Sequence, residues 1–422
     1  MPQLISLLGL FVMIGLAWLL SSHKRRFPWR IVAGGLVLQF GFALVILKTR
    51  PGRLIFDALG EFVNRLLEFV DRGSLFLFAI YPQQAGEEEL LPPHFTLLRT
   101  FAFSILPTII FFSSLMAMLY HLGVMQRVVD GLAWLMRRTL GTSGAETLSA
   151  AANIFVGQTE APLVVRPYVA GMTLSELNVV MVGGFATIAG GVLAAYVRMG
   201  IDAGHLITAS VISAPAALLV AKVMVPETHE RGSSEPVRAA AGSKYVNLLE
   251  AAADGATEGL KLALNVAAML LVFVALIAMA DAAVGWLGAL FGYIGEDGQP
   301  VWSLSAGLGF LLAPLAWVMG IPWEDCPEAG ELLGIRTVLN EFIAYDQLAR
   351  LDDVLESRTK TIMTYALCGF ANFASIGIQL GGIGGIAPER RGDLARLGLF
   401  AMIGGTLTAL MTACVAGILL TN

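Results

Sequence analysis

The stretch NIFVGQTEAPL, residues 153–163, decides the fold of this chain. It lies within apolar sequence, yet it contains Gly157 and Pro162. Both residue types weaken a continuous helix. The pattern therefore predicts two half-helices, about 145–156 and 160–170, that meet at a tip instead of one spanning helix. Such a re-entrant hairpin leaves backbone groups unpaired at membrane depth, which is tolerated only where they line a cavity or bind something.

Composition places the chain in a membrane. Of its 422 residues 56% are hydrophobic and 14% are charged, and the mean hydropathy is +0.74. Soluble domains carry roughly 25% charged residues. The net charge is −5, with no basic block that would suit nucleic acid. The three cysteines and five histidines are scattered, which indicates neither a metal cluster nor a disulfide framework and argues against a membrane enzyme.

Several apolar stretches are long enough to cross a bilayer, which takes about 20 residues. They are predicted at 4–20, 31–48, 98–121, 176–198, 203–225, 262–290, 361–386 and 394–420. The first is expected to be a retained helix, because its flank lacks the pattern of a signal peptide. Residues 54–71 have helical amphipathic spacing and are expected to lie along the interface. For 303–320, a short span and an interfacial helix both remain open.

Basic residues predict the orientation. The loop SSHKRRFPWR, 21–30, is expected in the cytoplasm by the positive-inside rule, so the N-terminus lies outside. The loop 226–248 and the segment ERRGDLAR, 389–396, are placed inside as well, which puts the C-terminus outside. Arg358 and Lys360, at the other end of the preceding span, do not fit this rule. The expected location is the plasma (inner) membrane.

Two segments repeat within the chain. GFATIAGG, 184–191, and GFANFASIG, 369–377, share Gly-Phe-Ala followed by a polar residue, and each comes after a broken polar segment with a carboxylate. Paired interrupted segments in two halves are the best sequence indication of a transporter binding site. Chance similarity of two small-residue helices is the alternative. The prediction is an all-α polytopic membrane protein with two re-entrant helical hairpins and two broken helices in an inverted repeat, plus scaffold helices.

Glu160 and Glu341 are the carboxylates of these broken segments. A charged side chain at mid-bilayer costs at least ~2.5 kcal/mol, so a functional role is favoured. The alternative is a structural ion pair, for instance with Arg166 or Arg336.

Neutral polar residues accompany the breaks and could hold a polar solute. They are Gln158, Thr159, Asn340, Asn372 and Ser375. Hydrogen bonding between helices is the alternative role, since it is common in membranes. Phe370 could form an aromatic wall, although packing is the simpler explanation.

At GQTEAP, RTVLNEFIAY and GFANFASIG the chain resembles the concentrative nucleoside transporters. The resemblance covers nearly the whole chain, in the form with eight transmembrane helices. It implies a homotrimer that imports nucleosides, coupled to Na⁺ or H⁺, by an elevator-type alternating-access mechanism. It also implies a scaffold of 1–141 with 262–290 at the trimer contact, and a connecting loop and helix at 226–261. The transport domain would then comprise 142–225 and 325–422.

The resemblance further implies individual site residues. The nucleobase would be read by Gln158, Thr159 and Glu160 and flanked by Val192 and Phe370. The ribose would be held by Glu341, Asn372 and Ser375. The Na⁺ ligands would come from Asn153, Val156, Thr187 and Ile188. Oxygen-only ligation suits a hard cation, so Na⁺ is the preferred coupling ion, with proton coupling through either glutamate as the alternative.

Other transport classes stay open at this point. A channel needs a continuous polar path, whereas hairpins around a closed polar site suit alternating access. The runner-up among carriers is an elevator-type protein for another small polar organic solute.

Overall fold

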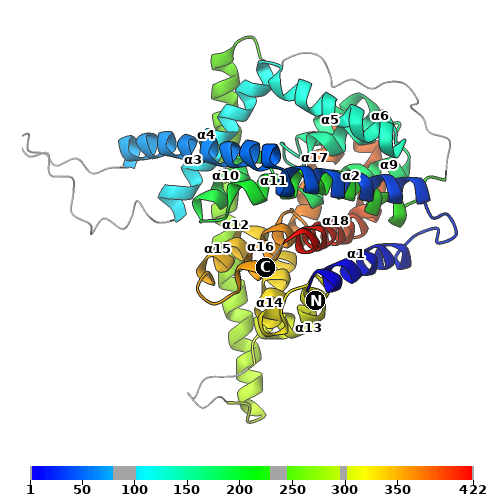
Figure 1. Cartoon of the computed structure of the whole chain (residues 1–422). Coiled ribbons are helices and arrows are strands. Elements are labelled where there is room, and N and C mark those ends of the chain that lie inside the picture. The colour runs from blue at the N-terminus through cyan, green and yellow to red at the C-terminus, as the bar shows by residue number, and fades with distance from the viewer. Residues whose placement is uncertain (1, 79–100, 229–244, 295–301, 421–422) are drawn as a thin grey trace, which may run out of the picture.

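The structure is a computed structural model that describes residues 2–78, 101–228, 245–294 and 302–420. The described elements are helices, as predicted (Figure 1). The polar stretch QQAGEEELLPPH, 83–94, whose composition predicts an exposed loop, and most of the loop at 226–248 lie outside the described residues.

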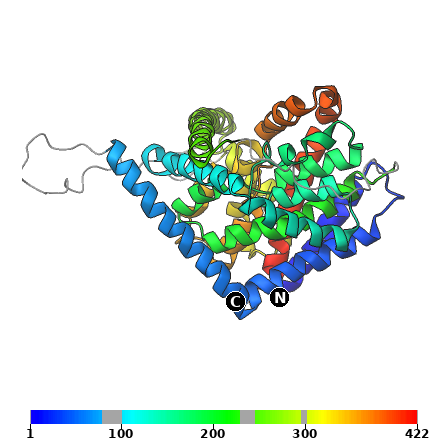
Figure 2. The same ribbon diagram turned by 90° about the horizontal axis from the view of Figure 1, so that it is seen from above.

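The N-terminal third forms five helices: α1 (Pro2–Leu19), α2 (Trp29–Lys48), α3 (Arg50–Phe78), α4 (Phe101–His121) and α5 (Val124–Leu140). Helix α3 extends the predicted amphipathic segment at both ends, and it buries small and apolar residues along one side. Viewed from above, α2 and α3 diverge from their junction as a V (Figure 2). Helix α2 packs against α11 (Ala203–Met224), and α1 packs against α18 (Arg391–Leu419).

The first hairpin is broken as the opening stretch predicts. Its first half is α6 (Gly144–Ala152), which begins with a capping box between Ser143 and Glu146. Its second half consists of two short helices, α7 (Ala161–Val164) and α8 (Arg166–Val169), rather than the single one expected. Each of these begins with a proline in its first turn, which is favourable there and unfavourable inside a helix.

The predicted span 176–198 is a broken helix, α9 (Leu174–Ala186) followed by α10 (Gly190–Arg198). The hairpin tip contacts this break, because Gly190 N donates a hydrogen bond to Phe155 O at 3.0 Å. A Cβ on Gly190 would lie 3.0 Å from the same oxygen, so glycine permits the close approach.

The second hairpin comprises α14 (Cys326–Val338) and α15 (Glu341–Arg350), preceded by the short turn η2 (Trp323–Asp325). Helix α15 begins at an Asn340 cap, whose Oδ1 accepts from Ile343 N at 3.1 Å. Residues 303–320 form α13 (Leu304–Val318), a helix of 15 residues that packs along α14.

The predicted span 361–386 is the second broken helix, α16 (Ser357–Leu367) and α17 (Phe373–Ile386), followed by η3 (Pro388–Arg390). Gly369 in the break has φ 148°, a conformation that favours glycine. A Cβ there would lie 2.6 Å from Phe185 O at the end of α9. The two Gly-Phe-Ala segments therefore meet at their breaks.

Helix α12 (Leu248–Leu290) has 43 residues and begins well before the span predicted at 262–290. It stands as the long vertical helix in Figure 1 and packs mainly against α4. Two glycines allow close packing, since a Cβ on Gly259 would lie 2.8 Å from Ile110 Cα and one on Gly255 2.7 Å from Ser114 Cα.

Among the described residues, seven segments are long and apolar enough to cross a membrane by length and composition. Together with the broken pair α16–α17, whose pieces are individually short, they account for the predicted spans.

Both ends of the described chain lie on the same side of the bundle (Figure 1). Arg358 joins them: its guanidinium donates to Gly417 O at 2.7 Å, to Ser6 Oγ at 3.3 Å and to Leu420 O at 3.4 Å. Its Nε donates to Gly320 O at 3.1 Å. Arg358, one of the two basic residues that do not fit the positive-inside rule, therefore has a structural role.

Candidate solute and cation site

Glu341 lies at the centre of a buried polar network. It is the first residue of α15 and is 2% exposed. Tyr196 on α10 donates its hydroxyl to Oε1 at 3.0 Å, and Asn372 Nδ2 donates to Oε2 at 3.1 Å. The carboxylate also benefits from the N-terminal end of its helix, where negative charge is stabilised. Both broken helices therefore contribute a donor to one acid.

The network continues from Asn372 to the tip of the first hairpin. Asn372 caps α17, and its Oδ1 accepts from Ser375 N at 2.9 Å. Gln158 Nε2 donates to Ser375 Oγ at 3.1 Å, and Gln379 Nε2 donates to Gln158 Oε1 at 3.1 Å. The predicted residues Gln158, Glu341, Asn372 and Ser375 are thus brought together, although they come from distant parts of the sequence.

The predicted cation ligands lie where two helices end. Asn153 follows the last residue of α6, and Thr187 follows the last residue of α9. Both approach Gly183: a Cβ there would lie 3.0 Å from Asn153 Nδ2, and Thr187 Oγ1 donates to Gly183 O at 3.0 Å. Helix C-termini carry partial negative charge and unpaired carbonyls, so this corner of the fold favours a cation.

A buried side-chain oxygen without a hydrogen-bond partner among the described residues also supports a cation site at this position. Asn153 is fully buried, its Nδ2 donates to Ser149 O at 3.1 Å, and its Oδ1 has no hydrogen-bond partner among the described residues. A buried amide oxygen without a partner is costly unless a ligand fills the gap. Val156 and Ile188 lie in the non-helical segments beside Asn153 and Thr187, where carbonyls are free of the helical pattern. The donor set is all oxygen, which fits Na⁺.

The other predicted residues lie around this network with differing burial. Val192 is 1% exposed in the main hydrophobic cluster, and Phe370 is half-buried against it. Thr159 lies against Gly382 on α17, where a Cβ would come within 2.8 Å of its methyl group. Glu160 directly precedes α7 without a capping hydrogen bond from its side chain, and it is exposed, in contrast to Glu341.

In the part of the chain that the structure describes, Glu160 and Glu341 do not form the ion pairs that were their alternative role. Among the described residues, neither Glu160 nor Glu341 has a basic partner within salt-bridge distance. Arg336 is fully buried, but its NH1 donates to Ala366 O at 2.5 Å, near the end of α16. It caps a broken helix instead of neutralising the acid in direct contact.

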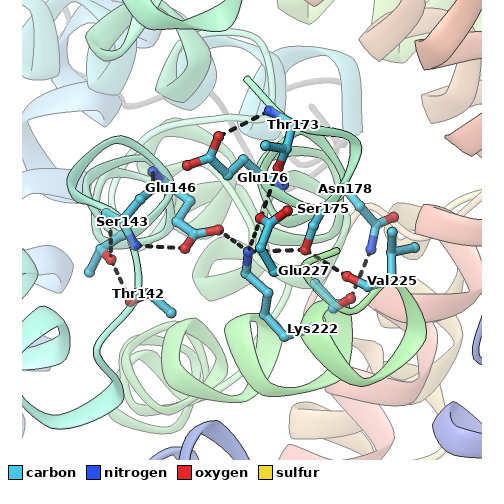
Figure 3. Close-up of polar contacts among 12 residues, drawn as sticks. Thr142, Ser143, Glu146, Thr173, Ser175, Glu176, Asn178, Lys222, Val225 and Glu227 are labelled. Atoms are coloured by element: carbon cyan, nitrogen blue, oxygen red, sulfur yellow. Dashed lines mark hydrogen bonds and ion pairs between the residues drawn. The ribbon is translucent and has the colours of Figure 1, made fainter. Parts of the chain in front are cut away.

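A second buried network, of charged residues, surrounds Lys222 (Figure 3). The Lys222 ammonium lies 2.6 Å from Glu146 Oε2 on α6 and 3.4 Å from Glu227 Oε2, and it donates to Ser175 Oγ on α9 at 3.0 Å. Thr173 Oγ1 also donates to Glu227, at 2.9 Å. One cation from α11 therefore holds together the first hairpin and the first broken helix.

Sequence reasoning missed Tyr196, Gln379 and Lys222. Each is a polar side chain inside an apolar span, and such residues are uncommon enough at that depth to mark a functional or structural contact. None of the three lies at a break of a helix. Their partners are distant in sequence, so the contacts themselves needed the structure.

Two hairpins and two interrupted helices around a buried polar centre define a secondary transporter, in which irregular backbone lines a binding site. Models of the Na⁺ dependent nucleoside transporter C-terminus and N-terminus match residues 205–417 and 8–80, and a nucleoside recognition model matches 102–203. The chain belongs to the family of Na⁺ dependent nucleoside transporters. This is a family of transporters and not of enzymes.

Curated relatives agree with the family models. Sodium/nucleoside cotransporter 1 of Rattus norvegicus is 45% identical over 99% of this chain. The chain spans 64% of that relative's length and 64% of the human one, which is 43% identical. An uncharacterized transporter of Haemophilus influenzae is 44% identical, with 99% of this chain and 98% of that protein covered.

Solved structures share the fold in several conformations. CNTnw in an inward-facing substrate-bound state has TM-score 0.88 and 42% identity, with 99% of this chain and 98% of that chain covered. A CNTnw variant in an outward-facing state has TM-score 0.89 and 42% identity over the same shares. Another variant, in the intermediate 1 state, has TM-score 0.91 with full coverage of both chains and 42% identity.

Proposed function

We propose that this protein is a Na⁺-coupled symporter that imports nucleosides through an elevator-type alternating-access mechanism. The observation that carries the proposal is the buried Glu341, which accepts hydrogen bonds from side chains of both broken helices. A carboxylate accepts strongly from the two neighbouring hydroxyls of a ribose. Nothing in a passive helix contact requires a buried charge at this position.

The solute is divided between the two halves of the chain. Glu341, Asn372 and Ser375 hold the ribose, while Gln158, Thr159 and Glu160 at the first hairpin tip read the base. Val192 and Phe370 flank the base. An amide side chain both donates and accepts, so it suits a base edge that does the same.

The coupling ion binds beside the solute, at the ends of α6 and α9. Asn153 and Thr187 supply side-chain oxygens, and Val156 and Ile188 supply carbonyls. Na⁺ is favoured over a proton by the orphaned Asn153 oxygen and by the two helix C-termini that face it. Because the ion fixes the tip of the first hairpin against the break of α9, its binding orders the site that receives the base.

The moving part comprises 142–225 and 325–422, and the scaffold comprises 1–141 with the span of α12, which supplies the contact of a homotrimer. Helix α12 supports this division, since large apolar residues such as Leu264, Leu271 and Trp286 are exposed on it. In the membrane such a surface meets lipid or another copy of the chain. The plasma (inner) membrane is the proposed location, with both termini outside the cytoplasm.

Uptake by proteoliposomes tests the proposal. A panel of labelled nucleosides is offered at fixed pH, once with Na⁺ and once with choline in its place. Accumulation that requires Na⁺ is expected, and undiminished accumulation in choline would end the sodium assignment and favour proton coupling. Counterflow is the matching control, because a carrier exchanges labelled for unlabelled solute and a pore does not. An amino acid panel addresses the alternative of a carrier for another polar solute.

A further inference from the structure

Gln379 is a fully buried amide on α17 that the proposed contacts leave out. It lies one helical turn after Ser375, facing the first hairpin. Its Nε2 donates to Gln158 Oε1 at 3.1 Å and to the backbone carbonyl of Met181 at 3.1 Å. A single amide nitrogen therefore links the tip of the first hairpin to the backbone of α9.

The Met181 carbonyl fixes which way the Gln379 amide points. A backbone carbonyl can only accept, so it must face the NH₂ group and not the oxygen of Gln379. In this orientation both Nε2 hydrogens are used, while Gln379 Oε1 is buried without a hydrogen-bond partner among the described residues. The reversed amide would turn an acceptor toward an acceptor at Met181, which is worse.

The orientation of Gln379 in turn fixes that of Gln158. Gln158 must offer its Oε1 to the Gln379 NH₂ group, which leaves its Nε2 facing Ser375 Oγ at 3.1 Å. The Ser375 hydroxyl can donate or accept a hydrogen bond, so it does not determine the orientation of the Gln158 amide. After these bonds Gln158 keeps one N–H donor and one oxygen lone pair, each in a defined direction.

We infer that Gln379 is a positioning residue for specificity: it fixes the amide of Gln158 and thereby the donor and acceptor pattern offered to a nucleobase. The inference rests on the proposed function. Uracil and cytosine test it well, because their pairing edges are reversed: uracil has an N3–H donor and an O4 acceptor, and cytosine has an N3 acceptor and an amino donor. A fixed Gln158 distinguishes these two edges, whereas a freely turning one does not.

Two substitutions separate positioning from packing. Gln379→Glu keeps the shape but carries at most one hydrogen in either protonation state, so it cannot donate to both Met181 O and Gln158. The Gln158 amide then turns its NH₂ group toward the introduced carboxyl group and its oxygen toward the Ser375 hydroxyl. Gln379→Met keeps most of the volume, offers no hydrogen, and leaves Gln158 able to turn either way.

The measurement is the ratio of uptake efficiencies, uridine to cytidine, in proteoliposomes at saturating Na⁺. Gln379→Glu should shift the ratio by about tenfold against the wild-type preference, the equivalent of one misdirected hydrogen bond. Gln379→Met should move the ratio toward one while uptake continues. The Na⁺ concentration for half-maximal uptake should stay as in the wild type, since neither change touches the cation ligands.

Ile383→Ala is the matched control, because Ile383 is fully buried on the same helix one turn further along and has an apolar side chain. It should lower thermal stability and leave the ratio unchanged. Three outcomes would overturn the inference. The uridine-to-cytidine ratio could stay at the wild-type value in both Gln379 variants, or it could equal one in the wild type. It could also shift in Ile383→Ala as much as in the Gln379 variants. If the wild type accumulates neither nucleoside, the proposed function itself fails, and that result is separate from any change in ratio.

Discussion

Both carboxylate oxygens of Glu341 accept hydrogen bonds from side chains of the protein itself. The Tyr196 ring packs against α15, with ring centroids 4.9 Å from Phe342 and 4.5 Å from Tyr345. The acid is therefore fixed in direction. Its unused lone pairs remain for a ligand, because a carboxylate has about four acceptor sites.

Glu341→Gln should lower nucleoside uptake by at least about tenfold, because the ribose loses a charged acceptor. The change is measured as initial uridine uptake at saturating Na⁺. Asp346→Asn is the control: it lies on the same helix, where it forms an exposed pair with Arg350 at 2.8 Å, and it should transport at the wild-type rate. A wild-type rate in Glu341→Gln would remove this residue from the site.

Asn153→Ala should raise the Na⁺ concentration needed for half-maximal uptake by about tenfold, since one side-chain oxygen leaves the cation. Uptake is titrated with Na⁺ at constant ionic strength. Asn178→Ala provides the comparison: its amide is equally buried on α9 and also has an oxygen without a partner among the described residues, but it donates to Ala221 O, away from the break. Equal shifts in both variants would place the cation elsewhere.

Site residues could be predicted from the sequence where polar side chains lie near a break in an apolar helix. Asn372 and Ser375 are polar residues near a break in an apolar span, and they share one network with Glu341, while their expected contact with ribose comes from the family resemblance. Tyr196 and Gln379 were missed because each lies inside a regular helix, where nothing in the local sequence shows its partner. Long-range hydrogen bonds follow from the crossing of helices and not from residue spacing.

Among the elements, the first hairpin and the first broken helix are held by one buried cation. Lys222 on α11 is 2% exposed and contacts α6, α9 and Glu227. Buried ion pairs contribute little net stability, but removing one partner leaves an uncompensated charge. This contact therefore makes the hairpin base and α9 dependent on a single side chain.

Lys222→Met should destabilise the protein by about 3–5 kcal/mol, because Glu146 and Glu227 lose their counter-charge. Thermal unfolding in detergent measures the loss as a lower Tm. Adding Glu146→Gln should recover part of it, since the second change removes the unpaired charge. Lys261→Met replaces a lysine whose side chain is 63% exposed, and it should leave Tm unchanged. An unaltered Tm in Lys222→Met would contradict the assigned role.

Helix breaks were predictable, whereas helix lengths were not. Glycine and proline marked the tip of the first hairpin and the Gly-Phe-Ala segments marked both broken helices. The expected connecting helix before 262 and the span 262–290 form one continuous helix, α12, and Glu250, Asp254 and Glu258 make its first part too polar to be recognised as part of a span. The second half of the first hairpin was expected to be one helix, although Pro167 begins a second one.

On the scale of the whole molecule, α12 exceeds what a bilayer requires. Its 43 residues correspond to about 65 Å at about 1.5 Å per residue, roughly twice the thickness of a hydrocarbon core. The helix must tilt steeply or project beyond the membrane. Helix α12 packs mainly against α4, which has 21 residues and can accompany only part of it, and this contact suits the proposed scaffold.

The proposed orientation can be read by labelling introduced cysteines in intact cells, since all three native cysteines are buried. Val354→Cys, four residues before Arg358, should react with a membrane-impermeant maleimide from outside, because its side chain is 65% exposed. His23→Cys, in the basic loop between α1 and α2, should react only after permeabilisation. The reverse labelling pattern would show the opposite orientation in the membrane. Labelling of both introduced cysteines from the same side would contradict the proposed topology.

The paired state of Glu341 has a consequence for turnover. A carrier that held its solute only through contacts formed on binding would release the solute slowly. In the proposed function, hydrogen bonds from two side chains of the protein orient this acid, which keeps the ordering that capture of the solute requires small. Tyr196 and Asn372 belong to the protein, so their hydrogen bonds to the carboxylate do not depend on the solute, and the proposed cycle would return the empty site without an unpaired charge at Glu341.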